Sequence, residues 1–475
     1  MTQQHIYPFT FGDMSQKDLL GGKGANLAEM VRIGLPVPPG FTIATTACRE
    51  YLKTGKFPEG LRKEISDSLS ALEKELGKTF GGVDNPLLVS VRSGAKFSMP
   101  GMMETVLNVG ITPEVAQAMA DSSGNARFAW DSYRRFIEMY GKIVCDVDGE
   151  EFHKVQERIL STHRITNLQD LDVEGLKALA DGFIKVIEAA TGRDFPTDPR
   201  EHLLGSIEAV FRSWNSERAT LYRRRERIPS DLGTAVNIQS MVFGNLSDDS
   251  GTGVAFTRNP SNGEIGSYGD YLQKAQGEDV VAGIRTPMSL DEFGVIEPKV
   301  HGELEKIMVA LESHYKDLCD IEFTIERGKL YILQTRVGKR TAEAAFRIAL
   351  QFVEEGVITM DEALARTSGD QLAMLMFPQF DTRGSLVEIA RGIPASPGAA
   401  VGEAVFDSKR AFDMSKAGKK VILVRRETSP DDLVGMVAAE GILTSRGGKT
   451  SHAAVVARGM GKTAICGTDS ISVDE

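Results

Sequence analysis

The sequence predicts a mixed α/β fold of the α+β type, and three observations support this prediction. Residues 1–110 combine short β-rich runs with Gly/Pro-rich turns, whereas residues 110–228 are mainly helical in pattern. Strand patterns return from residue 233, and Cys319–Arg336 has the pattern of a β-hairpin. A second glycine-rich region begins at Pro394. Runs of strands followed by runs of helices are typical of α+β proteins or of separate domains.

Length and composition are those of a globular protein with two to four domains. The 475 residues are 41% hydrophobic and 25% charged, with a formal charge of −11, so a basic nucleic-acid-binding surface is not expected. The four cysteines form no C-x-x-C pair, which disfavours disulfides and a zinc site. We find no signal-peptide pattern and no apolar run of about 18 residues. We therefore expect a cytoplasmic protein that binds neither nucleic acid nor a membrane.

Periodicity predicts the elements of the first two thirds of the chain. Apolar residues at three- and four-residue steps predict helices at Gly124–Cys145 and Val173–Gly192. Apolar, β-branched runs predict strands at Ala235–Val242 and Gly253–Thr257, separated by a Gly/Asn/Ser-rich turn. These two strands mark the return from the helical segment to a sheet.

The following residues are predicted to form helices and then a connector. Arg340–Leu375 has a helical pattern that is broken at Gly356 and Gly369. Gln379–Ile393 contains turn-forming residues and no clear period, which indicates a connector.

The last region has the pattern of a small α/β domain. Buried strands are predicted at Val421–Val424, at Gly441–Thr444 and near Ala464. A further strand pattern begins at Ile471–Glu475, so we expect residues 394–475 to form a domain that is incomplete at its C-terminus.

The hairpin at Cys319–Arg336 has a predicted register. Glu326–Gly328 suits a three-residue loop, a type I turn followed by glycine in the left-handed conformation. This loop would set Asp320 opposite Gln334 and Phe323 opposite Tyr331. Because side chains alternate along a strand, one face would be apolar and point into a core. The apolar residues of that face are Ile321, Phe323 and Ile325.

The other face of this hairpin would carry polar side chains. They are two carboxylates, an amide and a guanidinium: Asp320, Glu322, Gln334 and Arg336. Such a set suits Mg²⁺ that bridges the phosphates of ATP. A solvated polar face with an acid–arginine pair is the alternative, and the hairpin alone does not decide between them.

Two loops near the N-terminus suit phosphate binding. Leu20–Leu27 places Lys23 among three glycines ahead of a helix, although it lacks the Walker A spacing. In Val89–Met103 a β-rich run ends at Arg92, whose guanidinium can contact two phosphate oxygens. A plain helix cap and a plain surface loop are the alternatives.

A histidine near the C-terminus has the setting of a nucleophile. His452 follows a Gly-Gly pair and opens the helix-forming run Ala453–Ala457, for which Thr450 or Ser451 is a natural N-cap. The positive end of a helix and glycine N–H groups favour an anion there. A neutral imidazole at this place can attack phosphorus. A polar turn before a packed helix is the alternative reading of the local pattern.

The segment Leu443–Gly461 resembles the phosphohistidine signature of phosphoenolpyruvate-utilising enzymes. Its residue sequence is most similar to that of the pyruvate, phosphate dikinase family. Lys449 stands where that family usually has Met. Further stretches resemble the family's ATP-grasp nucleotide domain, so that the likeness covers essentially the whole chain. They are Gly21–Met30, Val91–Gly110, Gly233–Pro260, Gln276–Pro287 and Asp320–Thr341.

The resemblance implies three regions of the chain. Residues 1–340 would be the ATP-grasp domain, with 110–228 as a largely helical insertion. Residues 341–393 would be a helical linker, and 394–475 a swivelling phosphohistidine domain that is truncated.

The resemblance also implies roles for individual residues. His452 would be phosphorylated, and Asp320 and Glu322 would hold Mg²⁺. Thr450 would be a regulatory site, since a threonine at this position is phosphorylated in some relatives. The ATP- and phosphate-binding residues would be Lys23, Arg92, Gln239, Met241, Val242, Glu278, Gln334 and Arg336. Lys96 and Phe97 depart from the small or basic residues usual in the family's phosphate loop.

The implied reaction is a double phosphoryl transfer. ATP would bind between two lobes of the ATP-grasp domain, and His452 would attack its β-phosphorus with loss of AMP. Inorganic phosphate would then remove pyrophosphate, and the phosphohistidine would convert pyruvate to phosphoenolpyruvate. The family's pyruvate-binding barrel is not expected in these residues, so the chain alone would perform the ATP half-reaction. Mg²⁺ and a monovalent cation are the implied cofactors, and a homodimer is implied for full-length members.

Two other functions remain open from the sequence. A phosphoenolpyruvate synthase, or another ATP-grasp dikinase that uses water in place of phosphate, would need the same histidine. A non-catalytic phosphocarrier or regulatory module would need no face suited to ATP and metal.

Overall fold

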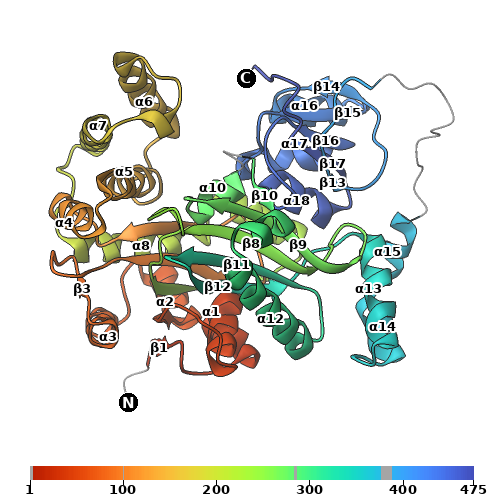
Figure 1. Cartoon of the computed structure of the whole chain (residues 1–475), viewed down its shortest axis with the longest axis horizontal. Coiled ribbons are helices and arrows are strands. Elements are labelled where there is room, and N and C mark those ends of the chain that lie inside the picture. The colour runs from red at the N-terminus through yellow and green to blue at the C-terminus, as the bar shows by residue number, and fades with distance from the viewer. Residues whose placement is uncertain (1–3, 100, 283–285, 376–387, 475) are drawn as a thin grey trace. The chain divides into compact units, whose positions relative to one another are not determined.

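The computed structural model describes residues 4–99, 101–282, 286–375 and 388–474. The chain divides into two compact units, Met1–Val242 and Phe243–Glu475, which are described separately (Figure 1). This division falls inside the predicted 1–340 domain, whose bounds stay a prediction, as do those of the linker and the phosphohistidine domain. The mixed α/β class is confirmed.

The first unit is built on a five-stranded antiparallel sheet with the strand order β1-β2-β7-β5-β6. The strands are β1 (Ile6–Pro8), β2 (Gly40–Ile43), β5 (Val89–Ala95), β6 (Thr105–Val109) and β7 (Thr234–Ser240), with a separate pair β3 (Thr79–Phe80) and β4 (Pro86–Leu87). Every residue of the central strand β7 is buried, so both faces of the sheet are covered there. The predicted strand at Ala235–Val242 is present as β7, which ends at Ser240.

Three helices lie within the first 110 residues, where only strands and turns were predicted beyond the glycine loop. They are α1 (Lys17–Arg32), α2 (Thr45–Thr54) and α3 (Leu61–Leu76). In α3 the buried residues Leu61, Ile65, Leu69 and Leu72 follow a helical period, which the sequence reading missed. Both α2 and α3 end at a glycine in the left-handed conformation, a common helix stop.

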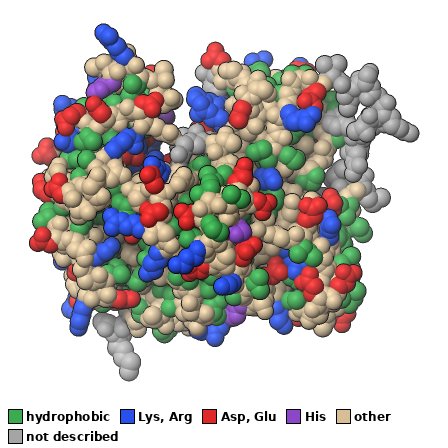
Figure 2. Space-filling model, viewed as in Figure 1, with side chains coloured by type: hydrophobic (Ala, Val, Ile, Leu, Met, Phe, Trp, Pro, Cys, Tyr) green, Lys and Arg blue, Asp and Glu red, His purple; other side chains and the backbone are tan. Residues whose placement is uncertain are grey.

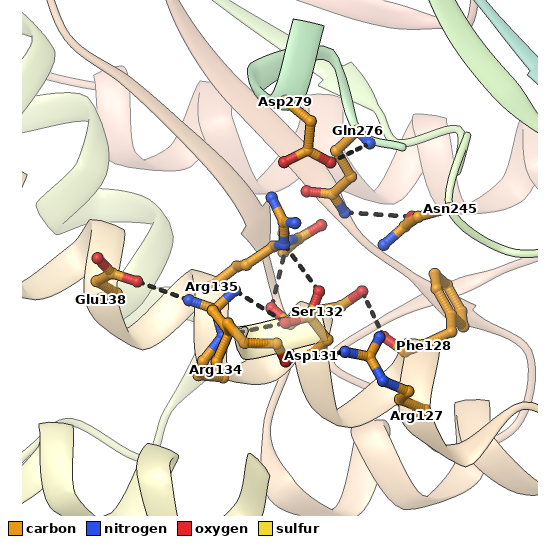
Figure 3. A network of polar contacts seen from close by, with 12 residues as sticks. Arg127, Phe128, Asp131, Ser132, Arg134, Arg135, Glu138, Asn245, Gln276 and Asp279 are labelled. Carbon is orange, nitrogen blue, oxygen red and sulfur yellow. Dashed lines mark hydrogen bonds and ion pairs between the residues drawn. The ribbon is translucent and has the colours of Figure 1, made fainter. Parts of the chain in front are cut away.

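The segment 110–228 is helical, as predicted. Its helices are α4 (Pro113–Ser123), α5 (Ala126–Ile143), α6 (Gly149–His163), α7 (Val173–Thr191), α8 (Pro199–Ser213) and α9 (Glu217–Arg225). Within α5, the buried Asp131 pairs with Arg134 and Arg135 at 2.8 Å (Figure 3). Burial alone would raise the pKa of Asp131, but the two guanidinium groups hold it well below its usual range. The negative charge of the buried Asp131 is thereby compensated.

The second unit contains a five-stranded antiparallel sheet with the order β10-β9-β8-β11-β12. Its strands are β8 (Gly251–Arg258), β9 (Ile265–Gln273), β10 (Met288–Ser289), β11 (Cys319–Glu326) and β12 (Lys329–Val337). The helices in this part are α10 (Gly277–Ala282), α11 (Leu290–Ile296) and α12 (Pro298–Tyr315). The predicted strand at residues 253–257 and the predicted hairpin are both present.

The hairpin β11–β12 differs from its predicted register. Its loop has two residues, Arg327 and Gly328, both with positive φ (50° and 70°), and Glu326 pairs with Lys329. A two-residue loop of this kind matches the right-handed twist of the strands better than a type I turn does. A bulge then makes Leu333 an extra residue on β12, because Phe323 pairs with Ile332 whereas Glu322 pairs with Gln334.

The bulge restores the predicted faces. Asp320 lies opposite Arg336, two residues from its predicted partner Gln334, and a shift of two residues keeps each side chain on the same face. The apolar face is buried as predicted, with Ile321, Phe323 and Ile325 at most 1% exposed.

Helices follow the hairpin, as predicted. They are α13 (Ala342–Glu354), α14 (Met360–Arg366) and α15 (Gly369–Met374). The predicted break at Gly356 is a turn with φ of 72°, and α15 begins at Gly369. The predicted connector 379–393 lies mostly outside the described residues, since residues 376–387 are not among them.

The C-terminal part of the second unit holds another five-stranded sheet, in the order β13-β17-β16-β15-β14. Strands β14 to β17 are parallel in this order, and only β13 is antiparallel to its neighbour. Its elements are β13 (Ile393–Ser396), β14 (Glu403–Val405), α16 (Ser408–Lys416), β15 (Val421–Arg425), α17 (Leu433–Ala438), β16 (Gly441–Thr444), α18 (His452–Met460) and β17 (Thr463–Cys466).

Three strands of this sheet and the helix that begins at His452 were predicted, whereas β13, β14 and the helices α16 and α17 were missed. The strand expected to begin at Ile471 is absent from residues 471–474, where the N–H of Ile471 donates to the carbonyl of Thr468 in a turn.

The described ranges contain no helix with both the length and the apolar character needed to cross a bilayer. Acidic and basic side chains are interspersed over the face of the molecule shown in Figure 2, so the net charge of −11 is not gathered into a single patch on that face.

Candidate functional site

The polar face of the β11–β12 hairpin has the composition that the sequence predicted. Arg336 Nε donates to Asp320 Oδ2 at 2.7 Å, and Gln334 Nε2 donates to Glu322 Oε1 at 3.1 Å. Asp320 and Gln334 are buried, whereas Glu322 and Arg336 are half-buried. Burial raises the pKa of Asp320, and the adjacent Arg336 guanidinium opposes this rise. The structure therefore brings together all four side chains of this face.

The chemistry of this face fits a divalent cation. Oδ1 of Asp320 is buried and has no hydrogen-bond partner among the described residues, so an acceptor oxygen is available to a ligand. No group of three or more His, Cys, Asp or Glu side chains suited to a metal occurs in the described ranges. Mg²⁺ is commonly bound by one or two carboxylates together with substrate phosphates, which fits Asp320 and Glu322.

The glycine loop of the first unit is pressed against strand β5. At Gly21, where α1 kinks with φ of 67°, a Cβ would lie 1.6 Å from the carbonyl oxygen of Gly94. Only glycine permits this approach. The contact brings Lys23 next to the end of β5. The Cβ of Lys23 lies 3.4 Å from the place that a Cβ would take at Gly94.

Arg92 lies on the same strand, two residues before Gly94, and is half-buried. Its register partners are Asn237 on β7 and Thr105 on β6. The first unit thus gathers Lys23 and Arg92 along one stretch of β5. In the loop after β5, Lys96 pairs with Asp18 at 2.5 Å.

The segment predicted to line the adenine ends the central strand β7. Gln239 is buried, and its Nε2 donates to the carbonyl of Pro38 at 3.2 Å. The N–H of Met241 donates to the carbonyl of Leu88, and both Met241 and Val242 are half-buried. The Gln239 side chain is therefore committed to packing within its own unit.

Glu278 lies in the short helix α10 of the second unit and is half-buried. The start of this helix is held by Asp279, whose Oδ2 accepts a hydrogen bond from the N–H of Gln276 at 2.9 Å (Figure 3). Within the family-like stretch Gln276–Pro287, residues 283–285 lie outside the described residues.

His452 is the first residue of α18, and Ser451 occupies the N-cap with extended backbone. The imidazole Nδ1 lies 3.0 Å from Thr428 Oγ1. The other nitrogen, Nε2, is buried and has no hydrogen-bond partner within the described part of the chain. One ring nitrogen is thus anchored, and the other carries no contact that would compete with a reaction.

Burial lowers the pKa of His452 to about 4, against a weak opposing effect of Asp431. The imidazole is therefore neutral at cellular pH, as a nucleophile must be. Lys449, three residues before His452, is not a cause of this shift. Its Nζ lies instead over the ring of Tyr268, 4.2 Å from the centroid.

Thr450 is buried and makes hydrogen bonds to a distant carboxylate. Asp270 Oδ2, on strand β9, accepts hydrogen bonds from the Thr450 hydroxyl at 2.6 Å and from its N–H at 3.0 Å. A Cβ at Gly448 would come within 2.7 Å of the same carboxylate oxygen, so a glycine is required there. Burial raises the pKa of Asp270, and the bonds from Thr450 oppose this rise. The loop before α18 is thereby fastened to the antiparallel sheet of the same unit.

Arg458 holds the loop from its other side. Its side chain is 2% exposed, and its two terminal nitrogens donate to the carbonyls of Ala395 and Lys449 at 2.8 and 2.7 Å. Its guanidinium also lies 5.7 Å from the ring centroid of Phe256 on β8.

Three residues at this loop were not predicted: Thr428, Asp270 and Arg458. Only Arg458 lies within the signature quoted for His452. In the chain, Thr428 is 24 residues from its partner His452, and Asp270 is 180 residues from its partner Thr450. No local signal in the sequence indicates these contacts.

Two family models match different parts of the chain. A family model described as "Pyruvate phosphate dikinase, AMP/ATP-binding domain" matches residues 17–59, 52–301 and 295–356, which is more than half of the chain. The chain belongs to the pyruvate, phosphate dikinase family. A second model, "PEP-utilising enzyme, mobile domain", matches residues 417–475, which include the His452 loop.

Members of the pyruvate, phosphate dikinase family resemble the chain over nearly its whole length. Pyruvate, phosphate dikinase of Rhizobium meliloti (strain 1021) is 53% identical over 98% of this chain. The enzymes of Clostridium symbiosum and of Arabidopsis thaliana, the latter chloroplastic, are each 50% identical, over 99% and 100% of this chain. These alignments cover 53%, 54% and 50% of the relatives, so the chain spans about half their length.

Proposed function

We propose that this chain carries out the nucleotide half-reaction of a dikinase, in which ATP and inorganic phosphate become AMP and pyrophosphate and a histidine is left phosphorylated. The proposed nucleophile is Nε2 of His452. Family membership and the names of the relatives support this reaction class.

One observation carries the proposal. His452 combines a pKa of about 4, an anchored Nδ1 and a buried Nε2 at the first residue of a helix. A neutral imidazole with one available lone pair is a competent nucleophile toward phosphorus. The N-terminus of α18 also favours the negative charge of a phosphoryl group at this place.

The residues proposed to bind ATP have distinct tasks. Lys23, Arg92 and Arg336 would neutralise charge on the phosphate oxygens, and Gln334 would donate to them. Asp320 and Glu322 would hold Mg²⁺, which, when bound, withdraws negative charge from the phosphates. Met241 and Val242 would line the adenine, with Gln239 and Glu278 supporting the nucleotide site.

Two phosphoryl steps follow from this assignment. Nε2 of His452 attacks the β-phosphorus, and the bond from that phosphorus to the bridging α–β oxygen breaks, so that AMP leaves. The histidine then carries both the β- and γ-phosphoryl groups. An oxygen of inorganic phosphate attacks the γ-phosphorus, the bond from that phosphorus to the oxygen that bridges it to the β-phosphorus breaks, and pyrophosphate leaves while the β-phosphoryl group stays on His452. Use of water in this second step would release phosphate instead. None of the described residues is proposed to bind pyruvate, and transfer to pyruvate is not part of this proposal.

The test uses ATP labelled at the β-phosphorus, with Mg²⁺ and inorganic phosphate. Acid-labile, base-stable label is expected on the chain and is expected to disappear in His452→Ala. Pyrophosphate formation from labelled inorganic phosphate identifies phosphate, and not water, as the second acceptor. Label retained in His452→Ala contradicts the assignment of the nucleophile, and label from the γ-position alone contradicts the attack on the β-phosphorus.

A further inference from the structure

We propose that Thr428 is a positioning residue that holds His452 in the tautomer with hydrogen on Nδ1, so that Nε2 presents a lone pair to phosphorus. The catalytic meaning of this proposal rests on the proposed function. The hydrogen bond itself is a property of the protein without substrate and can be tested separately.

The topology of the parallel sheet brings the two residues together. Strands β15 and β16 are adjacent and parallel, so their carboxyl ends lie at one edge of the sheet. Thr428 follows β15 by three residues, and the loop after β16 leads to α18 and His452. Thr428 is buried, with 7% of its surface exposed, and its Oγ1 lies 3.0 Å from His452 Nδ1.

The polar surroundings of the ring favour one direction for this hydrogen bond. A neutral imidazole has one N–H and one acceptor nitrogen, and a hydroxyl can serve either. If Thr428 donated to Nδ1, the N–H would be on Nε2, which is buried without a partner among the described residues. Buried N–H groups without an acceptor are rarer in proteins than buried acceptors without a donor. We infer that Nδ1–H donates to Oγ1 of Thr428.

This direction suits the chemistry of the transfer. As Nε2 forms its bond to the β-phosphorus, the bridging oxygen takes the bonding electron pair and leaves with AMP. The ring becomes positively charged, and its proton stays on Nδ1. The hydrogen bond to Thr428 strengthens as this charge develops, because a charged donor makes a shorter and stronger bond. Thr428 therefore needs neither to gain nor to lose a proton.

The experiment compares three variants. Thr428→Val removes the hydroxyl at nearly constant size, and Thr428→Ser keeps it. Thr463→Val is the matched control, because Thr463 pairs with Gly441 at the opposite ends of the parallel strands β16 and β17. The first measurement is the ¹⁵N chemical shift of both His452 ring nitrogens near pH 7 without ATP, which reports the tautomer directly. The second is the initial rate of ATP-dependent labelling.

We expect a protonated Nδ1 in the wild type, in Thr428→Ser and in the control. In Thr428→Val the Nε2–H tautomer should become populated, and labelling should slow by about 10- to 100-fold, as when partners that orient functional histidines are removed. If Thr428 had only a structural role, its replacement by valine would not change the tautomer of His452.

Two results overturn the proposal. One is a wild-type His452 protonated on Nε2. The other is a folded Thr428→Val variant with unchanged tautomer and labelling rate. If Thr428→Val fails to fold, the wild-type shifts and the Ser variant still decide the question. A wild type that takes no label from ATP contradicts the proposed function, while its ring shifts still test the role of Thr428.

Discussion

Two regions of the second unit carry the proposed chemistry, and they are built in opposite ways. The polar face of the β11–β12 hairpin consists of residues at most 16 positions apart, joined by strand pairing and by the bonds Asp320–Arg336 and Glu322–Gln334. The His452 loop is held by Thr428 and Asp270, which come from distant parts of the unit, and by Arg458, which lies in the same helix as His452.

The difference shows which contacts fix the side-chain positions in each region. In a hairpin, alternation of side chains defines which residues share a face, and the turn defines their partners. In the loop before α18, the backbone could adopt many conformations, and contacts with distant residues select one of them. We therefore expect local replacements to act on the hairpin without disturbing the fold, and replacements of distant partners to act on the loop.

The largest effect is expected from Glu322→Leu. This change removes one of the two carboxylates of the hairpin face and the acceptor of Gln334 at 3.1 Å, while the ion pair of Asp320 and Arg336 remains. AMP formation from ATP should fall by about 100-fold or more, the scale seen when a single electrostatic group is removed from an active site. Glu322 is only half-buried, so thermal unfolding should change little.

The matched control for this variant is Lys329→Leu, which replaces an exposed charge on the same hairpin beside its turn. AMP formation within about twofold of wild type is expected for a surface change of this kind. Normal ATP turnover by Glu322→Leu would show that the carboxylates of this face have no role in the reaction.

An intermediate effect is expected at Thr450, the proposed regulatory position. In Thr450→Glu a carboxylate stands two residues before His452 and against the buried Asp270. Repulsion between this negative charge and ATP should slow labelling by about tenfold or more, and the clash with Asp270 should lower the melting temperature.

The double variant Thr450→Glu/Asp270→Asn separates these two causes. Asparagine keeps an accepting oxygen but removes the charge of Asp270, so the melting temperature should recover while labelling stays slow. Recovery of labelling in the double variant would assign the effect to the contact with β9. Unchanged labelling in Thr450→Glu alone would remove the proposed regulatory role.

The smallest effect concerns pH. Because burial lowers the pKa of His452 to about 4, the NMR resonances of its ring should shift little between pH 8 and pH 5.5 and titrate with a midpoint near 4. An exposed histidine would titrate near 6.5. A midpoint at or above 6 would show that water solvates the ring more fully than the structure describes, and that the loop does not shield the ring.

The same shift affects stability, with a defined sign. The folded state binds a proton at His452 only near pH 4, whereas the unfolded state binds it near pH 6.5. The free energy of unfolding should therefore decrease as the pH falls from about 6.5 to about 4, and His452→Gln should remove this part of the pH dependence. Chemical denaturation at several pH values measures it.

Several features followed from the sequence because the signals are local. The helices at 126–143 and 173–191 follow a 3.6-residue period, and the burial of Ile321, Phe323 and Ile325 follows a period of two. The helix after Ser451 follows from small helix-forming residues behind an N-cap. The roles proposed for His452 and for the nucleotide-binding residues came from the family resemblance together with the local residue patterns.

Other features could not be predicted, for reasons that differ between regions. The register of the hairpin was wrong because Arg327 adopts a positive φ and Leu333 forms a bulge, and neither has a distinctive sequence signal. The strands β13 (Ile-Pro-Ala-Ser) and β14 (Glu-Ala-Val) were missed because neither is a continuous apolar, β-branched run like that of β15. The partners Thr428 and Asp270 were missed because they are distant in the chain.

The sequence by itself determined the α/β class, the apolar and polar faces of the hairpin, and a histidine at the start of a helix behind two glycines. These properties depend on side-chain period and backbone propensity, which act over a few residues. Only the tertiary structure decided that His452 is half-buried with a buried Nε2, that its ring is neutral and bonded through Nδ1 to Thr428, and that Thr450 is held by Asp270. The pKa of an imidazole and the direction of its hydrogen bonds depend on which distant groups exclude water from the ring, and chain folding alone brings those groups together.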